Sequence, residues 1–466
     1  MRTRHRPILG ETSDGLPLPQ RHWALLTLVL AIVMSVLDSS MVNVALPTIA
    51  VELDTTPASS VWVVNAYQLA IIATLLPLSS LGESIGYRRI SIGGLAVFTL
   101  ASLLCALADS LQTLIAARLL QGLGAAGIMS VNAALVRFIY PRSKLGRGIG
   151  IIALTVSVSA ASGPTVAAAI LSLAEWPWLF AINVPVGLLA LVIALRSLPA
   201  TRRSPHPFDV PSAILNALTL VLIIRGIDDI GHGESWLRVG LQLGGGVLLG
   251  LILLRRQFGL PSPLVPVDLL RIPVFALSSA TSACSYVAQM LAYVSLPFYF
   301  HDGLGHSAVV TGLLMTPWPI TVGIMAPLAG ALSDRYSVGL LCTAGLAVLA
   351  LGLGLLALLP ASPAAFDIAW RMAICGAGFG FFQSPNNRAL MDSAPRARSG
   401  GASGMLGTSR LFGQTLGAVI AALILGISSG RGSATALCVA ALFALLAALV
   451  SSSRLLASPT LDEPGS

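Results

Sequence analysis

The stretch ALLTLVLAIVMSVLDSSMVNVALPTIAV, residues 24–51, decides the fold class. It carries a single charged side chain, Asp38, in an otherwise uncharged and mostly apolar run. A helix needs about 20 such residues to cross the hydrocarbon core of a membrane. The stretch therefore predicts a transmembrane helix. Its acid lies about 14 residues, or roughly 21 Å, from the inner end of that helix.

The rest of the chain has the same character. Of its 466 residues, 55% are hydrophobic and 10% are charged, against about 25% charged in soluble proteins. So few charges cannot cover a water-exposed surface, which excludes a soluble enzyme and predicts an all-α polytopic membrane protein. Fourteen candidate spans start near residues 24, 59, 90, 112, 147, 178, 210, 238, 275, 310, 338, 366, 402 and 433. The seventh and eighth, at about 210–227 and 238–254, are the shortest.

The basic residues predict the orientation. The chain has 27 Lys and Arg and 19 Asp and Glu, for a net charge of +8. With the N-terminus inside, most basic residues fall in cytoplasmic segments, whereas acids such as Asp109, Asp229 and Asp302 fall in outer loops. An excess of Lys and Arg marks cytoplasmic loops. The pattern predicts that both termini are cytoplasmic, and it assigns the basic balance to orientation and not to nucleic-acid binding.

An enzyme is the alternative of a different class. The six histidines lie in loops or termini, and the sequence contains no HExxH, GxSxG or P-loop motif. Neither a catalytic residue, a metal site nor ATP hydrolysis is therefore predicted. The five cysteines lie in apolar runs without CxxC spacing, which is typical of small buried hydrophobic residues.

The two halves of the chain repeat each other. At an offset of 254 residues, Gly122, Gly124 and Gly163 correspond to Gly376, Gly378 and Gly417. Eight spans account for that offset, so we expect two six-helix bundles with two inserted helices. The expected parts are a cytoplasmic N-terminus (1–22), an N-terminal bundle (23–199), a linker with two extra helices (200–271), a C-terminal bundle (272–457) and a cytoplasmic tail (458–466). Parallel halves with a site between them are typical of secondary transporters.

Several motifs resemble those of one family. Residues 37–47 (LDSSMVNVALP) are similar to the first-span motif of the 14-span drug:proton antiporter branch of the major facilitator superfamily. Further motifs resembling that branch lie at 62–69 (WVVNAYQL), 118–124 (RLLQGLG), 176–185 (WPWLFAINVP) and 409–417 (SRLFGQTLG). The resemblance covers about residues 20–457. It implies the major facilitator fold and multidrug or quaternary ammonium efflux coupled to protons.

Two motifs depart from that family. The loop at 79–89 (SSLGESIGYRR) keeps the acid as Glu83 but lacks the first glycine and the first arginine of the family pattern. In the fifth span, Gly163 and Pro164 are followed by Ala167 and Ala168, where the antiporter motif has two glycines. The second departure bears on the direction of transport and not on the fold.

Asp38 and Arg118 are the candidate proton-coupling residues. An ionisable group deep in a span costs several kcal/mol unless it is paired or hydrated, so function is the default interpretation and a helix-packing hydrogen bond is the alternative. Asp38 lies roughly 15 Å and Arg118 roughly 9 Å from the outer ends of their helices, depths at which the two charges can interact. The resemblance implies that Arg118 assists proton coupling, and a static counter-ion is the alternative.

A second set of candidates lines the expected substrate cavity. Tyr286, Gln289 and Tyr293 share one face of the ninth span because they are three and four residues apart. Aromatic faces bind lipophilic cations with about 0.5–2 kcal/mol each, although ordinary packing is the alternative for any single ring. Arg410 either holds the C-terminal half together or meets an anionic group. The complete set is Met34, Met41, Tyr67, Tyr286, Gln289, Tyr293, Trp318, Phe382, Asn386 and Arg410.

Helix ends and small residues supply the remaining candidates. Glu83 and Asp334 lie at the cytoplasmic ends of equivalent helices, near Arg88, Arg89 and Arg335, and predict a gate whose ion pairs form in one state and break in the other. Small residues permit close helix approach. The predicted packing or hinge residues are Gly122, Gly124, Gly163, Pro164, Gly413 and Gly417.

Together these features predict a proton-coupled secondary transporter that exports small lipophilic, cationic compounds by alternating access. The alternative is export of an endogenous metabolite or of a neutral or anionic toxin, since one deep acid is set against two deep arginines. No cofactor is expected beyond the proton gradient. The expected partners are substrate, protons and membrane lipid, without nucleic acid, for a monomer in the bacterial inner membrane.

Overall fold

A computed structural model of the chain describes residues 15–141, 145–201, 208–231, 234–258, 268–333, 335–360, 362–394, 399–427 and 432–456. These ranges consist of helices and connecting loops and contain no strand. Thirteen helices among the described residues are long and apolar enough to cross a membrane, or fourteen if the bent helix α6 (Leu145–Leu171) counts as one span. The predicted all-α polytopic architecture is confirmed.

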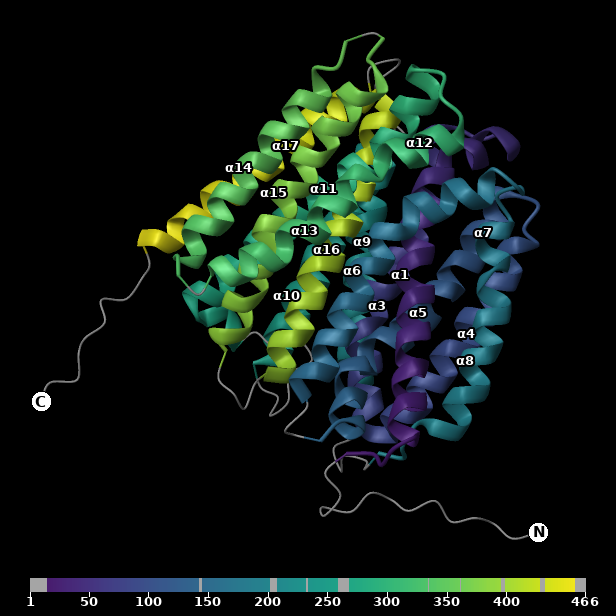
Figure 1. Cartoon of the computed structure of the whole chain (residues 1–466), viewed down its shortest axis with the longest axis vertical. Helices are drawn as coiled ribbons and strands as arrows, with labels where there is room; N and C mark the ends of the chain where they lie inside the picture. The colour runs from purple at the N-terminus through teal and green to yellow at the C-terminus, as the bar shows by residue number, and fades with distance from the viewer. Residues whose placement is uncertain are drawn as a thin grey trace, which may run out of the picture. The chain divides into compact units, whose positions relative to one another are not determined.

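Contacts along the chain define two compact units (Figure 1). Unit 1 comprises Met1–Arg256 and Phe300–Leu313, and unit 2 comprises Gln257–Tyr299 and Leu314–Ser466. The helices of unit 1 are α1 (Gln20–Glu52), α2 (Pro57–Ser60), α3 (Trp62–Ile85), α4 (Tyr87–Ala106), α5 (Leu111–Ile139), α6, α7 (Trp178–Ala181), α8 (Asn183–Ser197), α9 (Val210–Gly231) and α10 (Trp236–Gln257). Those of unit 2 are η2 (Leu269–Arg271), α11 (Pro273–Phe298), α13 (Pro317–Leu332), α14 (Val338–Ala357), α15 (Ala365–Asp392), α16 (Ser399–Ile427) and α17 (Gly432–Leu456). Two boundaries between the units, before Phe300 and after Leu313, fall within the π-helical turn η3 (Tyr299–Gly303) and within α12 (Ala308–Met315).

The two units share one packing pattern. In unit 1, α5 packs against α3 and α4, while α1 packs against α6 and α8. In unit 2, α15 packs against α13 and α14, while α11 packs against α16 and α17. Each helix of the second set stands in the repeat position of its counterpart in the first. The internal repeat predicted from sequence spacing is therefore present in the structure.

Glycine pairs set the closest contacts of this repeated pattern. A Cβ atom added to Gly94 of α4 would lie 2.8 Å from the carbonyl oxygen of Gly124 in α5. A Cβ added to Gly345 of α14 would likewise lie 2.8 Å from the carbonyl oxygen of Gly378 in α15. Such distances leave no room for a side chain, so in both units the two helices meet backbone to backbone.

Local residue choices end and break the helices. Gly86 has φ +103°, a conformation that favours glycine, and it lets α4 begin directly after α3 ends. Ser110 begins α5 with a capping box that it forms with Thr113. Pro317, which has no backbone N–H, starts α13 immediately after the break at Thr316 that ends α12.

The inserted helices are longer than the sequence patterns predicted. The structure extends the seventh span to Val210–Gly231 and the eighth to Trp236–Gln257. Asp229, predicted in an outer loop, instead lies buried in the last turn of α9. Its carboxylate pairs with Arg238 Nε at 3.0 Å and accepts a hydrogen bond from Gln242 Nε2 at 3.0 Å. These partners on α10 compensate the buried charge of Asp229, so α9 can continue past this residue to Gly231.

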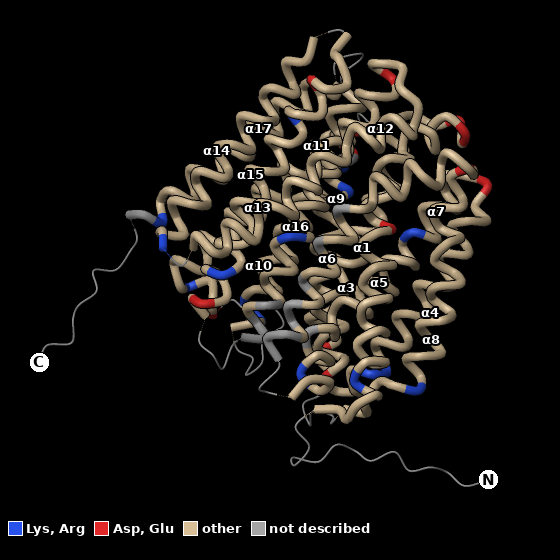
Figure 2. The backbone as a smooth tube through the Cα atoms, in the orientation of Figure 1, with Lys and Arg blue, Asp and Glu red and all other residues tan. Residues whose placement is uncertain are grey.

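The two inserted helices belong to unit 1, and α9 packs on α3. Asn216 Nδ2 of α9 donates to the carbonyl oxygen of Ala73 in α3 at 2.9 Å. In unit 1 the basic residues gather mostly at the end near the N-terminus, and acidic residues gather at the opposite end near α7 (Figure 2). This is the asymmetry from which the orientation was predicted, and the orientation itself stays a prediction.

Candidate functional site

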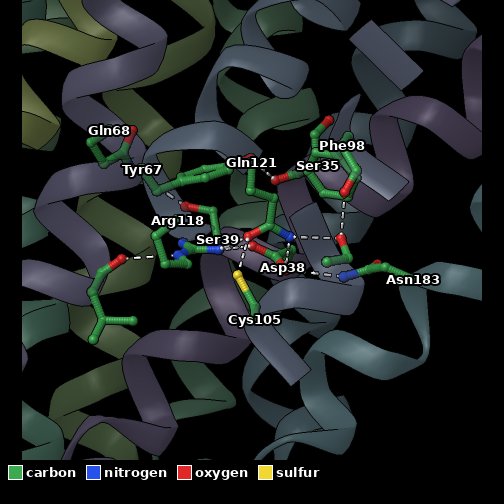
Figure 3. Close-up of polar contacts among 12 residues, drawn as sticks. Ser35, Asp38, Ser39, Tyr67, Gln68, Phe98, Cys105, Arg118, Gln121 and Asn183 are labelled. Atoms are coloured by element: carbon green, nitrogen blue, oxygen red, sulfur yellow. Dashed lines mark hydrogen bonds and ion pairs between the residues drawn. The ribbon is translucent and has the colours of Figure 1, made fainter. Parts of the chain in front are cut away.

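Asp38 lies at the centre of a buried polar network in unit 1 (Figure 3). Its Oδ2 atom lies 2.5 Å from Arg118 Nη1 of α5, and neither side chain is exposed. Its Oδ1 atom accepts hydrogen bonds from Gln121 Nε2 at 2.9 Å and from Asn183 Nδ2 at 3.0 Å. Three donors from α5 and α8 therefore hold the carboxylate on α1.

Arg118 is fixed from several sides. Its Nε atom donates to the carbonyl oxygen of Val63 in α3 at 2.9 Å, and its Nη1 atom also donates to Gln121 Oε1 at 2.6 Å. The guanidinium carbon lies 4.1 Å from the centre of the Tyr67 ring and 5.5 Å from that of Phe180. The arginine thus connects α5 to α1 and α3, and its buried Nη2 atom remains without a hydrogen-bond partner among the described residues.

Gln121 uses its whole amide within the network. Its Nε2 atom donates to Asp38 and to Ser102 Oγ, the latter at 2.9 Å, and its Oε1 atom accepts from Arg118 and from Cys105 Sγ at 3.6 Å. The carboxylate needs a donor and the guanidinium needs an acceptor, so the network fixes the orientation of the amide. The two ionic partners are therefore bridged by a neutral group that contacts both.

Sequence reasoning did not select Gln121 and Asn183 as site residues. Gln121 follows Arg118 by one helical turn, so its place on the same face was a usable signal. Asn183 is the first residue of α8, at the break that separates it from α7. It is a polar residue within an apolar run, but its sequence position does not show that it faces α1.

The three other cavity candidates predicted in this half of the chain are buried side chains that pack between helices of unit 1. Tyr67 is buried, and its hydroxyl donates to the carbonyl oxygen of Ser35 at 2.9 Å while its ring covers Arg118. Met34 and Met41 are buried as well. A Cβ atom added to Gly187 of α8 would lie 2.9 Å from Met34 Cε, so this methionine fills the contact between α1 and α8.

The network contains one carboxylate, and its charge matters for the packing around it. Asp38 is the carboxylate of the network, and protonation would exchange its ion pair with Arg118 for a neutral acid. The guanidinium would then be a buried charge without a counter-ion, which is strongly unfavourable. The negative charge of Asp38 therefore contributes to the packing of α1 against α5. No group of His, Cys, Asp and Glu suited to a metal ion occurs among the described residues.

In unit 2 a polar cluster lies on the equivalent helices. Gln383 Nε2 of α15 donates to the hydroxyl oxygen of Tyr286 in α11 at 2.8 Å. Arg410 of α16 is close enough for its charge to act on the same hydroxyl. The Tyr286 ring packs edge-on against Phe379 at 5.3 Å between centroids, and Phe379 packs against Phe382 at 5.9 Å. The structure therefore brings the predicted residues Tyr286, Phe382 and Arg410 into one neighbourhood.

The remaining predicted residues of unit 2 occupy two other places. Tyr293 packs edge-on against the buried Trp318, with 5.2 Å between the ring centroids. Gln289, which is half-buried, lies one turn before Tyr293 on the same face of α11. Asn386 is only 1% exposed and belongs to a separate cluster. Its Nδ2 atom donates to the carbonyl oxygen of Ser278 at 3.2 Å, and its Oδ1 atom accepts from Arg454 Nη1 at 3.0 Å.

Arg454 organises this separate cluster from the last turn of α17. Its guanidinium also donates to Ser278 Oγ at 3.0 Å and to Ser451 Oγ at 2.9 Å. The cluster thus connects α11, α15 and α17. Arg454 is one of the basic residues that the sequence pattern assigns to the cytoplasmic side, because a basic residue at the end of a span usually marks that side. That pattern gives no sign of the cluster around it.

The predicted gate residues that the structure describes lie at or beside helix ends. Glu83 and Arg89 are exposed, and Arg88 Nη2 donates to the carbonyl oxygen of Leu195 near the end of α8 at 2.7 Å. Arg335 is exposed, and Asp334 lies outside the described residues. The gate stays a prediction.

The predicted packing residues lie at tight contacts. A Cβ atom added to Gly122 would lie 2.7 Å from Ala70 Cβ of α3, and one added to Gly413 would lie 2.8 Å from Tyr286 Cβ of α11. Gly124, Gly163 and Gly417 face Phe98, Ser40 and Met290 in the same close manner, and the carbonyl oxygen of Pro164 lies against Gly312. These positions agree with the predicted packing role.

Repeated bundles of membrane-spanning helices around buried polar clusters define an integral membrane transporter. The chain belongs to the major facilitator superfamily, whose sequence model matches residues 28–418. It is 57% identical to the uncharacterized transporter YebQ of Escherichia coli over 95% of this chain and 97% of that protein. It is 30% identical to the riboflavin transporter RibZ of Clostridioides difficile, over 85% and 87%. It is 28% identical to the multidrug efflux pump LfrA of Mycolicibacterium smegmatis, over 88% and 81%.

Solved structures of transporters share the fold. A POT family transporter matches with a TM-score of 0.71 at 14% identity, covering 94% of this chain and 96% of that one. A bacterial homologue of the human lysosomal transporter Spinster matches with a TM-score of 0.68 at 16% identity, covering 96% and 100%. The family resemblance predicted from the motifs is confirmed, and the protein is a transporter and not an enzyme.

Proposed function

We propose that this protein is a proton-coupled exporter of small lipophilic compounds, with Asp38 as the proton carrier. The observation that carries the proposal is the fully buried ion pair between Asp38 and Arg118, at 2.5 Å. An ionisable pair at this place in the membrane is costly to keep, and such residues mark ion pathways and proton relays. A purely structural hydrogen bond between helices would not need two charges.

The proposed cycle follows from the contacts of the pair. Deprotonated Asp38 holds α1 against α5 through Arg118 and against α8 through Asn183. A proton on Asp38 ends the ion pair and frees Arg118, so the protonated and deprotonated proteins favour different packings of these helices. A proton can shift the equilibrium between two states only if its binding differs between them, and this arrangement supplies that difference.

The proton gradient is the proposed energy source, with no other cofactor. One proton that moves inward down a membrane potential contributes about 2.3 kcal/mol per 100 mV, enough for roughly a fiftyfold substrate gradient. We place the protein in the bacterial inner membrane with both termini in the cytoplasm, as a monomer surrounded by lipid. The positive-inside pattern of the sequence supports this orientation.

The charge of the substrate is a separate question. The preference for cations that we inferred from the sequence required an available carboxylate, but both oxygens of Asp38 already accept hydrogen bonds. The proposal therefore concerns lipophilic compounds in general. The second candidate function, export of a neutral or anionic compound, is favoured by Arg410, whose buried Nε atom has no hydrogen-bond partner among the described residues. One turn further along α16, Gly413 packs closely against Tyr286 of α11.

Transport by purified protein in liposomes tests the proposed function. The substrates are tetraphenylphosphonium as a lipophilic cation, riboflavin as a neutral compound and 2-naphthoate as an aromatic anion. Wild-type protein should accumulate at least one of them only when a pH gradient is imposed, and Asp38→Asn should not. Asp109→Asn, which removes a carboxylate from an outer loop, is the matched control and should behave like wild type. Gradient-driven accumulation by the Asp38→Asn variant would show that another group carries the proton.

A further inference from the structure

Arg410 differs from the other described arginines of unit 2 that lie within its long helices. Arg371 pairs with Asp367 at 3.0 Å, and Arg388 pairs with Asp392 at 3.4 Å. Arg454 donates to the side chains of Ser278 and Asn386. Arg410 forms neither an ion pair nor a hydrogen bond with any described residue, and its Nε atom is buried.

The depth of Arg410 makes this lack of a partner significant. It lies about 16 Å from the start of α16 and about 25 Å from its end. Its side chain is only partly exposed. A guanidinium within a membrane span needs a counter-ion, an acceptor or water, because desolvation of an unpaired charge is costly. No carboxylate among the described residues of unit 2 pairs with Arg410.

The neighbouring groups offer donors to the same place. The hydroxyl oxygen of Tyr286 accepts its hydrogen bond from Gln383, so its own proton remains available to donate. Gly413 lies one turn after Arg410 on α16 and contacts Tyr286 closely, which keeps α16 against α11 at this level. Arg410 and Tyr286 therefore present a cation and a neutral donor, and both suit an anionic oxygen.

Aromatic rings adjoin these donors. Tyr286, Phe379 and Phe382 form a chain of edge-on contacts with centroid distances of 5.3 and 5.9 Å. Such rings favour an aromatic or otherwise apolar body beside the charged group. Asp38, the acid deep in the first span, is not free to attract a cation, since it is paired with Arg118 within unit 1.

We propose that Arg410, Tyr286 and the adjoining Phe379 form a binding site for the anionic oxygen group of a lipophilic aromatic acid. The site takes a carboxylate on Arg410 and Tyr286 and places the aromatic body beside Phe379. The physiological relevance of this ligand class as cargo rests on the proposed export function, but binding itself does not require transport. The site disfavours lipophilic cations of the same shape, because they would meet the charge of Arg410.

Equilibrium binding to the full-length protein in lipid nanodiscs, without a pH gradient, tests the site. Three probes share one ring system and differ in charge: 2-naphthoate, the neutral 2-naphthamide and the cation (2-naphthylmethyl)trimethylammonium. Wild-type protein should bind 2-naphthoate most tightly in isothermal titration calorimetry. Arg410→Gln should weaken its binding roughly tenfold to a hundredfold, as expected for a charge-assisted hydrogen bond. The same variant should leave binding of 2-naphthamide unchanged, which also shows that the protein remains folded.

Two further variants sharpen the result. Tyr286→Phe keeps the ring and removes one donor, so it should weaken 2-naphthoate binding by a smaller factor than Arg410→Gln. Arg388→Gln removes an exposed arginine of the same unit and should leave all three affinities unchanged. The site is overturned if the cation binds as tightly as 2-naphthoate, if none of the probes binds, or if Arg410→Gln leaves the affinity for 2-naphthoate intact. Tight 2-naphthoate binding, together with no gradient-driven transport of any of the three liposome substrates, would instead contradict the proposed function and leave the site standing.

Discussion

Arg118 on α5 and Asp38 on α1 form an ion pair from which solvent is excluded, and the neutral amide of Gln121 contacts both partners. The pair therefore does two things at once. It joins two helices, and under the proposed function it makes their packing depend on whether a single carboxylate carries a proton. A surface ion pair could do neither, because water would replace the lost partner at little cost.

Removing one charge of this pair should be worse than removing both. Asp38→Asn leaves a buried guanidinium without a counter-ion, and breaking a buried pair in this way costs about 3–5 kcal/mol. The double variant Asp38→Asn with Arg118→Gln should recover much of the lost thermal stability in detergent. Neither variant should support gradient-driven transport. A double variant less stable than both single variants would contradict the counter-ion role of Arg118.

Gln121 should contribute to stability through its four hydrogen bonds. Gln121→Leu would remove one hydrogen bond each from Asp38, Ser102 and Cys105, and such bonds contribute about 0.5–1.5 kcal/mol each, or more when one partner is charged. The variant should unfold at a correspondingly lower temperature. Gln112→Leu, on the exposed first turn of the same helix, is the matched control and should change stability by less than about 0.5 kcal/mol. Equal effects of the two substitutions would contradict the role assigned to Gln121.

Two adjacent glycines of α4 should respond oppositely to the same substitution. A Cβ atom added to Gly94 would overlap the backbone of Gly124 and Gly127, whereas one added to Gly93 would meet nothing within 4 Å. Gly94→Ala should therefore destabilise the protein by about 1–3 kcal/mol, as overpacking does. Gly93→Ala should be neutral or slightly stabilising, because alanine favours the helix. Thermal unfolding of the two variants, measured side by side, checks the close contact between α4 and α5.

The features that were predicted correctly from the sequence are those that depend on a single helix. Apolar run lengths located the spans, and the 254-residue offset located the repeat that pairs Gly124 with Gly378. The distances of Asp38 and Arg118 from the outer ends of their helices indicated that the two charges could interact. Spacing within a helix does not determine which neighbour a face meets, so Asn183 and Arg454 were not recognised as network residues. Asp229 was placed in a loop for the same reason, because its partner Arg238 lies on another helix.

The start of α9 should loosen in acid. Asp209 accepts hydrogen bonds from Ser212 N at 3.3 Å, Ser212 Oγ at 2.6 Å and Arg256 Nη2 at 3.0 Å. Partial burial raises the pKa of Asp209, but the bonds from Ser212 and Arg256 outweigh it and hold that pKa below its ordinary value. A carboxyl with a lowered folded-state pKa stabilises the fold above its unfolded-state pKa of about 3.9. That stabilisation is lost as the pH falls through the lowered value.

Hydrogen exchange in the first turn of α9 measures this effect. Protection relative to the rest of the helix should be constant near neutral pH and should fall below about pH 4. Asp209→Asn should already show the lower protection at neutral pH and should respond little to further acid. An acid response of equal size in both proteins would assign it to another group.

The last prediction concerns the path of the chain through the membrane. Three spans, α9, α10 and α11, separate the segment that ends at Arg203 from Asp302 in η3. An odd number of crossings puts these two points on opposite sides, and the positive-inside pattern puts Arg203 in the cytoplasm. An alkaline phosphatase reporter fused after Arg203 should therefore be inactive, and one fused after Asp302 should be active, because that enzyme needs an oxidising compartment. A third fusion after Gly233, between α9 and α10, should also be active. Matching signals after Arg203 and Asp302 would mean that one of the three helices α9, α10 and α11 does not cross. The Gly233 fusion would separate the cases: an inactive reporter there places the fault in α9, and an active one places it in α10 or α11.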